Sequence, residues 1–412
     1  MNLTLTYSEN PELIEGVESI MKKNKIILAF SGGLDTSFCV LWLKKQGFEV
    51  VTLTVDTGGF TKKDLAQIKN QAEILNVSKH ITKSAKREFY EQIVTYVIKG
   101  NLLRWGVYPL CAGPERMIIA KKLTEVAVCE KAEYVAHGST GAGNDQVRFD
   151  VAIKTLAPAL KIITPIRDLN ITRNQEIEYL RKLKIPVNSI SKSYSINKGL
   201  LGVTIGGKET KNSWESPPDE VYPGIRPVEK TPDMPEEIIL NFQKGLPLNG
   251  IKIMKKLEDL GGKHGVGKGI HLGTTILGIK GRIAFAAPAI TILIKAHAEL
   301  EKLVLTKWQL FWKNQLSEVY GNFLHEALYY DPVMRDIEAL INSSQDNVTG
   351  EVKVRLYKGN IVIVGVKSPY SLLDKKVAVY GEKNTLWNGR DAAGFTKIYG
   401  IQSILSAKSK HT

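Results

Sequence analysis

Cysteine is scarce in this sequence. The three cysteines, Cys39, Cys111 and Cys129, lie far apart, and they form no CxxC pair or closely spaced set with histidine. An odd number of separated cysteines is typical of reduced thiols and does not suit a disulfide framework or a structural zinc site. We therefore expect the thiols to pack in the core, and we predict no metal-ligating residues.

Long hydrophobic runs and export signals are absent as well. The longest nearly apolar stretch, from Ala284 to Ile294, is too short to cross a bilayer and contains Pro288 and Thr291. The first residues, MNLTLTYSENPELIEG, have neither the basic start nor the apolar segment of a secretion signal. The sequence therefore predicts no membrane partner, and a cytoplasmic location is expected.

Dense basic blocks are missing, although the chain has a formal charge of +14. Its lysines are scattered and do not alternate with aromatic residues as they would on a nucleic-acid-binding surface. We interpret these lysines as residues on solvent-exposed faces of helices, and we predict no nucleic-acid partner. An anionic substrate needs only a few of these charges.

The sequence does contain a loop rich in glycine and hydroxyl groups, SGGLDTS at residues 31–37. The loop follows the apolar run KIILAF and precedes an amphipathic stretch over residues 36–46, so we expect a strand-to-helix turn. Glycines let backbone amides approach an anion, and the free N–H groups and dipole of a helix start attract it. The Walker A pattern is absent and no lysine lies inside the loop. The loop therefore predicts a phosphate site of another kind.

A strand-then-helix rhythm runs from Lys25 to about Pro186. This rhythm predicts an α/β fold with a doubly wound parallel sheet. The expected strands are residues 25–30, 49–56, 79–82, 134–136 and 162–166, and the expected helices include residues 36–46, 61–75 and 114–130. A capping pair of Thr61 and Asp64 is expected at the start of the second helix.

The rhythm ends after Pro186. Residues 211–235, rich in proline, glycine and acidic residues, predict a long loop. Residues 288–319 predict one long amphipathic helix, and residues 350–367 predict a hairpin with its turn at Gly359-Asn360. We expect an α+β second half, and the domains 1–24 (N-terminal extension), 25–186 (nucleotide-binding domain), 187–370 (second domain) and 371–412 (C-terminal tail).

A second glycine-rich loop, HGSTGAGNDQVRF, spans residues 137–149. Its glycines would allow a ligand to approach the backbone, and Thr140 and Asn144 offer hydrogen bonds. Asp145 can hold an ammonium group, and Arg148 can fork onto a carboxylate or phosphate. Few structural turns need all of these groups, so the cluster predicts a binding site.

The first loop resembles the SGGxD[ST]S loop of the ATP pyrophosphatases, which cut ATP between its α and β phosphates. Together, AFSGGLDTS at 29–37 and HGSTGAGNDQVRF at 137–149 resemble the argininosuccinate synthases. The resemblance extends over almost the whole chain after about Lys25, with further matching segments near 156–168, 262–267, 278–282 and 286–297. It implies a PP-loop domain of the adenine nucleotide alpha hydrolase-like class, followed by a C-terminal synthetase and multimerisation domain that reaches across a homotetramer.

The resemblance also implies a reaction. Members of this family join citrulline and aspartate, using ATP and Mg²⁺, to give argininosuccinate, AMP and pyrophosphate in arginine biosynthesis. The ureido oxygen attacks the α-phosphorus, and the aspartate amine then displaces AMP from citrullyl-AMP. Phosphate charge would be stabilised by amides, magnesium and cationic side chains, and no covalent enzyme intermediate is expected.

Carried over position by position, the resemblance implies three groups of site residues. ATP would be bound by Ala29, Phe30, Ser31, Gly32, Gly33, Leu34, Asp35, Thr36, Ser37, Val55 and Gly138. Aspartate would be bound by Thr140, Asn144 and Asp145. Citrulline would be bound by Tyr108, Gly113, Asn144, Arg148, Ser195, Thr204, Gly273 and Phe285. The candidate catalytic residues among these are Asp35, Ser37, Asp145 and Arg148.

The chain departs from the family pattern mainly at one end of one substrate. Ala112 and Gly113 stand where the family has a Thr-Ser pair for the citrulline carboxylate. Gly273 and Phe285 stand where it has a Glu and a Tyr for the citrulline ammonium. A Gly cannot pair with an ammonium, and Phe cannot replace the hydrogen bond of a phenol. A separate departure is Ala142, where many members have Lys.

These departures leave two hypotheses for the acceptor. Neighbouring residues such as Arg116 or Lys192 could rebuild an ordinary citrulline site. Alternatively, the acceptor is citrulline with an acylated amine, for which a glutamate would be a liability and the missing side chains would make room.

Two other classes of function are alternatives. A tRNA-modifying enzyme would share the first loop, but the reactive cysteine pair of thiolating members is not evident and the second loop would be unexplained. A non-catalytic descendant would keep the fold as a binding or assembly protein. The joint presence of Asp35, Asp145 and Arg148 argues against a non-catalytic protein, because a site without activity does not need all three.

Overall fold

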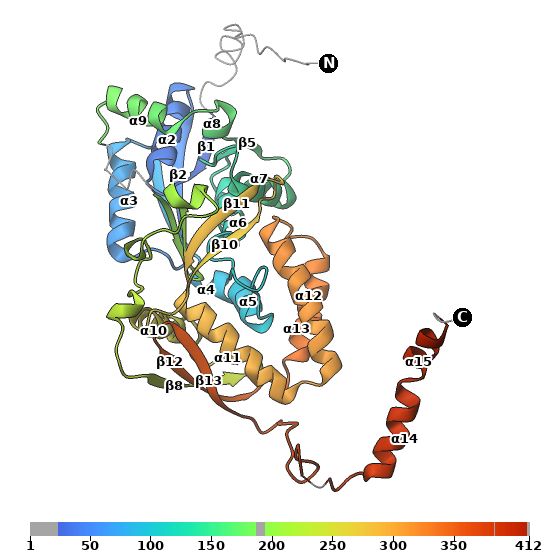
Figure 1. Ribbon diagram of the computed structural model, residues 1–412. Coiled ribbons are helices and arrows are strands. Elements are labelled where there is room, and N and C mark those ends of the chain that lie inside the picture. The colour runs from blue at the N-terminus through green and yellow to red at the C-terminus, as the bar shows by residue number, and fades with distance from the viewer. Residues whose placement is uncertain (1–23, 187–193, 383, 410–412) are drawn as a thin grey trace.

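The computed structural model describes residues 24–186, 194–382 and 384–409. Residues 1–23 of the expected N-terminal extension, and Lys192, lie outside the described residues. The first part of the chain forms a parallel sheet, and the second part forms two antiparallel sheets with helices packed against them (Figure 1). The predicted sequence of an α/β part followed by an α+β part is confirmed.

The first sheet has five parallel strands in the order β3-β2-β1-β4-β5. Alternate residues of the first strand enter different cores, because Ile27 packs into one buried cluster while Ile26 and Leu28 pack into another. Burial on both faces explains why the sequence of this strand is continuously apolar. The strands are β1 (Lys25–Ala29), β2 (Glu49–Asp56), β3 (Lys79–Ser84), β4 (Tyr134–Ala136) and β5 (Lys161–Ile163).

Helices cover both faces of this sheet. On one face lie α2 (Leu34–Lys45), α3 (Lys62–Ile74) and α9 (Arg173–Lys182), and on the other α4 (Lys86–Phe89), α5 (Thr95–Lys99), α6 (Glu115–Cys129) and α7 (Asn144–Leu156). The predicted capping pair of α3 is confirmed. Thr61 Oγ1 accepts from the Asp64 N–H at 3.2 Å, and Asp64 Oδ2 accepts from the Thr61 N–H at 2.8 Å.

The prediction of a strand over residues 162–166 is wrong at both ends. The strand begins at Lys161 and stops at Ile163, and α8 (Pro165–Asp168) follows. Proline has no N–H for a strand ladder but suits the first position of a helix. The Asp168 carboxylate closes this turn by accepting from the Thr164 N–H at 3.0 Å and from its hydroxyl at 2.7 Å.

The second part contains two four-stranded antiparallel sheets, in the orders β10-β11-β7-β6 and β13-β12-β8-β9. Its strands are β6 (Tyr194–Gly199), β7 (Gly202–Gly207), β8 (Glu236–Gln243), β9 (Leu246–Pro247), β10 (Lys268–Thr274), β11 (Lys280–Ala286), β12 (Gly350–Tyr357) and β13 (Asn360–Lys367). Its helices include α10 (Gly250–Lys263) and α13 (Val333–Ser344). One buried cluster runs from Ile27 through Leu293 to Val352, so the two parts share a core.

The single long helix predicted over residues 288–319 is wrong, because two helices occupy this region. They are α11 (Pro288–Val304) and α12 (Lys307–His325). The break follows from a capping box: Thr306 Oγ1 accepts from the Gln309 N–H, and the Gln309 side chain accepts from the Thr306 N–H. The predicted hairpin is confirmed, but its turn is Lys358-Gly359, where both residues have positive φ.

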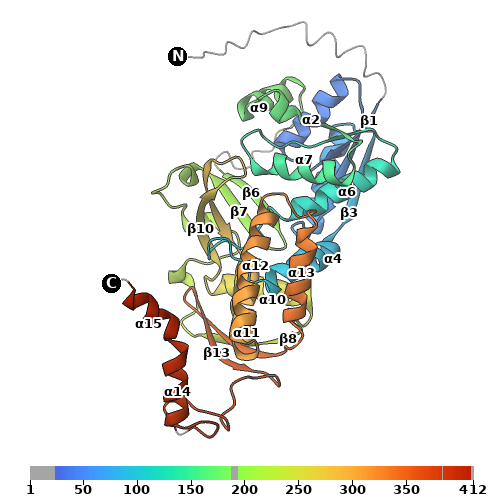
Figure 2. The same ribbon diagram turned by 90° about the vertical axis from the view of Figure 1, so that its right-hand side faces the viewer.

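The C-terminal arm, α14 (Gly389–Tyr399) and α15 (Ile401–Lys408), stands apart from the body of the chain in both views (Figures 1 and 2). Its apolar side chains are largely exposed, including Phe395, Ile398, Tyr399 and Leu405. A second exposed group lies on α12, where Phe311 packs against both Trp308 and Trp312. Within the described residues, therefore, these apolar side chains lack the cover that a core would give.

Two expectations about composition also have structural outcomes. Cys39 and Cys111 are buried free thiols, as expected, but Cys129 is exposed because it is the last residue of α6 and faces away from the sheet's core. The apolar stretch from Ala284 is divided between β11 and α11. Among the described helices, none is both long enough and apolar enough to span a membrane.

Candidate active site

The first glycine-rich loop connects β1 to α2. Gly32 has φ of +72°, which a side chain would disfavour, and Gly33 is the N-cap of α2 without any side-chain cap. The Ser31 and Thr36 hydroxyls face each other at 3.3 Å. Ser37 is buried and receives a hydrogen bond from Gln71 at 3.4 Å. The helix start thus keeps its amides for a ligand, as expected of a phosphate loop.

The second glycine-rich loop packs directly against the first. Strands β1 and β4 are neighbours and parallel, so both loops leave the same edge of the sheet. A Cβ added at Gly138 would lie 3.3 Å from Thr36 Cγ2 and 3.4 Å from the Asp35 carbonyl carbon. The structure therefore brings together the two loops that the sequence singles out separately.

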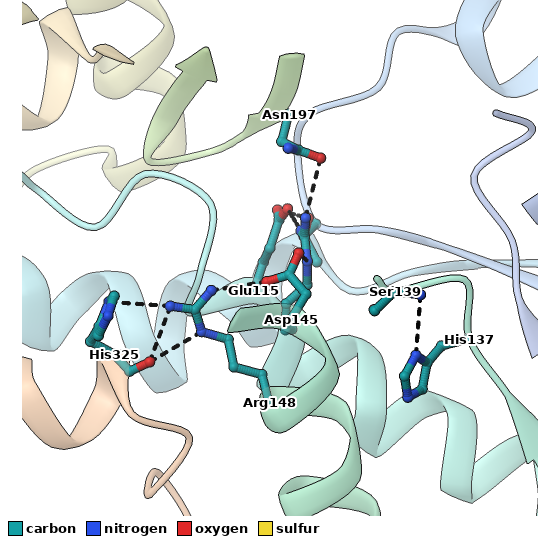
Figure 3. Close-up of polar contacts among 9 residues, drawn as sticks. Glu115, His137, Ser139, Asp145, Arg148, Asn197 and His325 are labelled. Carbon is teal, nitrogen blue, oxygen red and sulfur yellow. Dashed lines mark hydrogen bonds and ion pairs between the residues drawn. The ribbon is translucent and has the colours of Figure 1, made fainter. Parts of the chain in front are cut away.

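A network of polar contacts fixes the conformation of the second loop. His137 Nδ1 accepts from the Ser139 N–H at 3.4 Å (Figure 3), and its Nε2 contacts Asp150 Oδ1 at 2.9 Å. Arg167 donates to the other Asp150 oxygen at 2.8 Å and to Gln146 at 3.2 Å. Burial lowers the pKa of His137 despite the nearby carboxylate, which favours the neutral ring. Gln146 in turn donates to the carbonyl of Gly141, so the loop is held along its length.

Asp145 lies between two guanidinium groups at the start of α7 (Figure 3). Its Oδ1 accepts from Arg148 at 2.9 Å and its Oδ2 accepts from Arg116 at 3.0 Å. Burial would raise the pKa of this carboxyl, but the two arginines outweigh burial and hold it below its usual value. Asp145 is therefore a carboxylate with two cationic partners already in place.

Arg116 links this carboxylate to the second part of the chain. It donates to Glu115 and, at 3.3 Å, to Asn197 on β6. Glu115 also accepts from the Thr57 hydroxyl at 2.7 Å. Burial raises the pKa of Glu115, although Arg116 and Thr57 oppose it. The arginine that the sequence offers as a replacement citrulline contact is thus committed to two carboxylates.

The candidate acceptor residues converge from distant segments. The Tyr108 ring lies 5.2 Å from the His271 ring and 5.5 Å from the Phe285 ring. Phe285 is opposite Thr204 in the sheet, and Thr204 is opposite Asn197. These residues form a wall that joins the region before α6 to strands β6, β7, β10 and β11.

The glycines that replace polar family residues lie in the same region. A Cβ at Gly113 would be 2.8 Å from Arg148 Cζ, and a Cβ at Gly273 would be 2.5 Å from His271 Nε2. Arg148 and His271 thus occupy space that side chains at these positions would need. Both are more than nine-tenths buried.

The remaining predicted residues lie around this cluster. Asn144 Oδ1 accepts from the Ile276 N–H at 2.9 Å, which ties the second loop to the β10–β11 hairpin. Thr140 and Ser195 are exposed. Ala29 is half-buried at the end of β1, and Phe30 and Val55 are buried beside the first loop.

Four residues of the site were missed at the sequence level: Arg104, His271, His325 and Glu176. Arg148 donates to the carbonyl of His325 at 3.1 Å and contacts its Nδ1 at 3.2 Å (Figure 3). Arg104 donates to the carbonyl of Thr274 at 3.2 Å. Arg104 and His325 stand inside the apolar stretches NLLRWGV and NFLHEAL, and that is the signal that could have identified them.

Glu176, on α9, lies near Asp35 of the first loop. It is 3% exposed, and its Oε2 has no hydrogen-bond partner among the described residues. Burial, followed by the neighbouring Asp35 carboxylate, raises the pKa of Glu176 to about 8. A protonated Glu176 can therefore lie against Asp35 where two carboxylates could not.

Comparison with known proteins gives a consistent result. The model of the "Arginosuccinate synthase N-terminal HUP domain" matches residues 25–186, and that of the "Arginosuccinate synthase C-terminal domain" matches residues 194–406. The chain is 41% identical to the argininosuccinate synthase of Dehalococcoides mccartyi over 393 residues, which are 93% of this chain and 96% of the relative. The corresponding enzyme of Pyrococcus furiosus is 41% identical over 395 residues, covering 94% and 95%. That of Methanocaldococcus jannaschii is 41% identical over 389 residues, covering 92% and 97%.

Proposed function

The chain belongs to the argininosuccinate synthase family and is an ATP-dependent ligase, and we propose that its two glycine-rich loops divide the reaction between them. Loop 31–37 would bind the ATP phosphates, and loop 137–149 would bind aspartate and the ureido acceptor. The observation that carries this assignment is the packing of Gly138 against Asp35 and Thr36. Because Gly138 has no side chain, the backbone of the second loop lies directly against these two residues of the first loop.

The first loop would act through its backbone. Attack of the ureido oxygen on the α-phosphorus forms an O–P bond and breaks the bond to the β-phosphate, so pyrophosphate leaves with the electron pair. Negative charge on the phosphate oxygens would face the uncapped start of α2 and the hydroxyls of Ser31 and Thr36. Fixed donors of this kind stabilise developing charge without reorganising.

We propose that Mg²⁺ enters with ATP and is held chiefly by phosphate oxygens. Among the described residues no group of three or more His, Cys, Asp and Glu side chains could hold a metal. Mg²⁺ commonly uses substrate phosphates with one or two carboxylates, so this is compatible with its use. Asp35 is the one carboxylate within loop 31–37 and would be the side chain to contact the ion.

The second loop would position the nucleophile. The aspartate amine, after losing a proton, forms a C–N bond to the adenylated ureido carbon and releases AMP. Asp145 would accept from the aspartate ammonium as a third cationic partner, which its 34% exposed side chain allows. Arg148 would orient the acceptor, because its guanidinium is fixed by Asp145 and by the His325 carbonyl.

Product identification tests the proposal. The full chain is incubated with ATP, Mg²⁺, aspartate and citrulline, and the products are identified by mass spectrometry together with a pyrophosphate assay. We expect argininosuccinate, AMP and pyrophosphate, and no turnover when either amino acid is omitted. ADP as the nucleotide product would contradict the role of the first loop. Pyrophosphate release with tRNA in place of the amino acids would instead support the nucleic-acid alternative.

We also propose that the protein is a homotetramer in which the C-terminal arm packs on other copies. The proposal is supported by the exposed apolar side chains of the arm and of α12. Sedimentation at micromolar concentration should give four chains for the natural sequence and fewer for Phe395→Asp combined with Tyr399→Asp. Lys397→Ser, on the same helix, should leave the assembly intact, and a monomeric natural protein would contradict the proposal.

A further inference from the structure

Two buried nitrogen atoms at the acceptor end have no hydrogen-bond partner. They are Arg104 Nε and His325 Nε2, and neither finds a partner anywhere in residues 24–186, 194–382 and 384–409. His325 is only 8% exposed, so water does not readily replace the missing partner. Orphan polar atoms of this kind are costly and uncommon in folded proteins, so they call for a ligand as an explanation.

Both orphan atoms carry a hydrogen. A guanidinium can only donate, so the 3.2 Å contact from Arg148 Nη2 makes His325 Nδ1 an acceptor. Burial, then the charges of Arg148 and Arg104, lower the pKa of His325 to about 2. The neutral ring therefore has its single proton on Nε2. Arg104 Nε always bears a hydrogen, so the missing partner of both residues is an acceptor.

The charges nearby favour an anionic acceptor. Arg104 and Arg148 both act on His325, and Arg104 also acts on His271, which stacks on Tyr108. Asp145 is already bonded to two arginines. Glu326 acts on Arg104 from a distance, and no ion pair joins these two within the described residues. These positive charges would stabilise a bound carboxylate, and they would repel an ammonium group.

The position of these residues identifies which substrate would bring the anion. Arg104 donates to the carbonyl of Thr274, the neighbour of Gly273, and its backbone pairs with Tyr108. His325 touches Arg148. Gly273, Tyr108 and Arg148 are all candidate acceptor residues, so the orphan donors belong to the acceptor end and not to the nucleotide end.

We propose that Arg104 and His325, with His271 beside them, form a carboxylate subsite for the amino-acid end of the ureido acceptor. This inference rests on the proposed function and names the chemistry that the acceptor presents. Two sources could supply the carboxylate. One is the α-carboxylate of free citrulline, and the other is the distal carboxylate of a dicarboxylic acyl group on its amine.

Four acceptors separate the sources. Citrulline and citrulline amide differ in the α-carboxylate, while N-succinyl-citrulline and N-butyryl-citrulline differ in the distal carboxylate at similar length. kcat/KM is measured for each with saturating ATP and aspartate. The subsite predicts that one charged member exceeds its neutral partner by about 10- to 100-fold, as expected for hydrogen bonds to a charged group.

Paired variants then assign that preference to the two donors. Arg104→Lys keeps the charge without the Nε–H, and Arg104→Met removes both. His325→Asn keeps an acceptor near the position of Nδ1 for Arg148 but removes the Nε2 donor, and His325→Gln restores a donor near Nε2. Arg87→Met, on an exposed residue that forms an ion pair with Glu91, is the matched control.

The expected result is that Arg104→Met and His325→Asn abolish the preference for the charged acceptor, because they lower kcat/KM much more for the charged acceptor than for the neutral one. Arg104→Lys should keep part of the preference, and His325→Gln should keep more of it than His325→Asn. Arg87→Met should leave the preference intact. If the variants lower kcat/KM equally for charged and neutral acceptors, or not at all, the subsite is refuted while the ligase function stands. Absence of pyrophosphate release by the natural chain with all four acceptors would refute the proposed function instead.

Discussion

The proposed nucleotide end and the proposed acceptor end of this site are built in different ways. The nucleotide end would be loop 31–37, between a parallel strand and the start of a helix, where backbone amides and glycines would make most of the contacts. The acceptor end consists of side chains from the segment before α6, from α7, from β10 and β11, and from the end of α12. A site made of backbone can be recognised from a short motif, whereas a site made of distant side chains requires the fold.

The largest effect is expected where the two loops touch. In Gly138→Val, the added carbons must push against Thr36 and Asp35, which a Cβ alone would already approach to 3.3 and 3.4 Å. We expect kcat/KM to fall about 100-fold, because misplacing a reacting group by about 1 Å has effects of that size. Steady-state kinetics measure it, with circular dichroism as the check on folding.

Gly141→Ala is the matched control for this change. Its added Cβ would meet Arg167 Cγ at 3.5 Å, an ordinary contact. We expect its kcat/KM to stay within about twofold of the natural chain. Equal losses in the two variants would show that the loop tolerates no substitution and would remove the argument from loop contact.

The next effect is expected at Asp145, which joins the two ends. Asp145→Asn keeps the shape but places an uncharged amide between Arg116 and Arg148. We expect kcat/KM for aspartate to fall about 10- to 100-fold, which is at the lower part of the range for charged pairs because the side chain is partly exposed. A loss confined to ATP binding would contradict the assignment of this residue to the amino acids.

The same variant has a pH signature. The folded-state pKa of Asp145 is lowered, so its contribution to stability is present above the unfolded pKa of about 4 and is lost as the pH falls through the folded value. The difference in Tm between the natural chain and Asp145→Asn should therefore be constant from about pH 6 to 8. It should shrink below about pH 4, where a persistent difference would show that charge is not its cause.

A smaller effect is expected at Gly113, within the acceptor end. The Cβ of Gly113→Ala would lie 2.8 Å from Arg148 Cζ, so the guanidinium must shift. We expect the KM for the acceptor to rise about tenfold, as for loss of one charge-assisted hydrogen bond, with the KM for ATP unchanged. Gly206→Ala, whose Cβ meets nothing within 4 Å, should change neither constant.

The smallest effect is expected at Glu176, which supports the nucleotide end from outside. Its folded pKa is raised to about 8, so its stabilising protonated form is fully present below the unfolded pKa and is lost as the pH rises through about 8. Glu176→Gln should therefore raise Tm by a few degrees at about pH 9 relative to the natural chain, and by less at about pH 5. Glu178→Gln, on the exposed face of the same helix, should change Tm equally little at both pH values.

The sequence predicted the elements whose cause is local. The apolar run over β1, the capping pair of Thr61 and Asp64, and the turn-rich loop after β7 each follow from neighbouring residues. The two errors, the strand over 162–166 and the single helix over 288–319, have local causes too. Pro165 and Thr306 are typical residues of a helix start, but the apolar pattern around them was given more weight. Fold class and chemistry were therefore within reach of the sequence.

The acceptor end was only partly within reach, and the reason is physical. From the sequence, Gly273 and Phe285 indicate only that two polar side chains of the family are missing. A motif cannot indicate which residues from other segments lie beside those positions. The structure shows which side chains surround these positions: Arg104, His271 and His325 come from three segments that only the packing of the two parts on one core brings together. Whether a polar atom is buried, and whether it has a partner, depends on those long-range contacts and on no nearby residue.

The sequence by itself thus determined the parallel sheet, the two glycine-rich loops and the use of ATP, since each depends on backbone conformations that a few consecutive residues dictate. Only the tertiary structure decided that Asp145 is held by two arginines and that Arg104 Nε and His325 Nε2 lack an acceptor. Hydrogen-bond satisfaction is a property of the packed chain, because each donor's partner can come from any segment that folding brings near it.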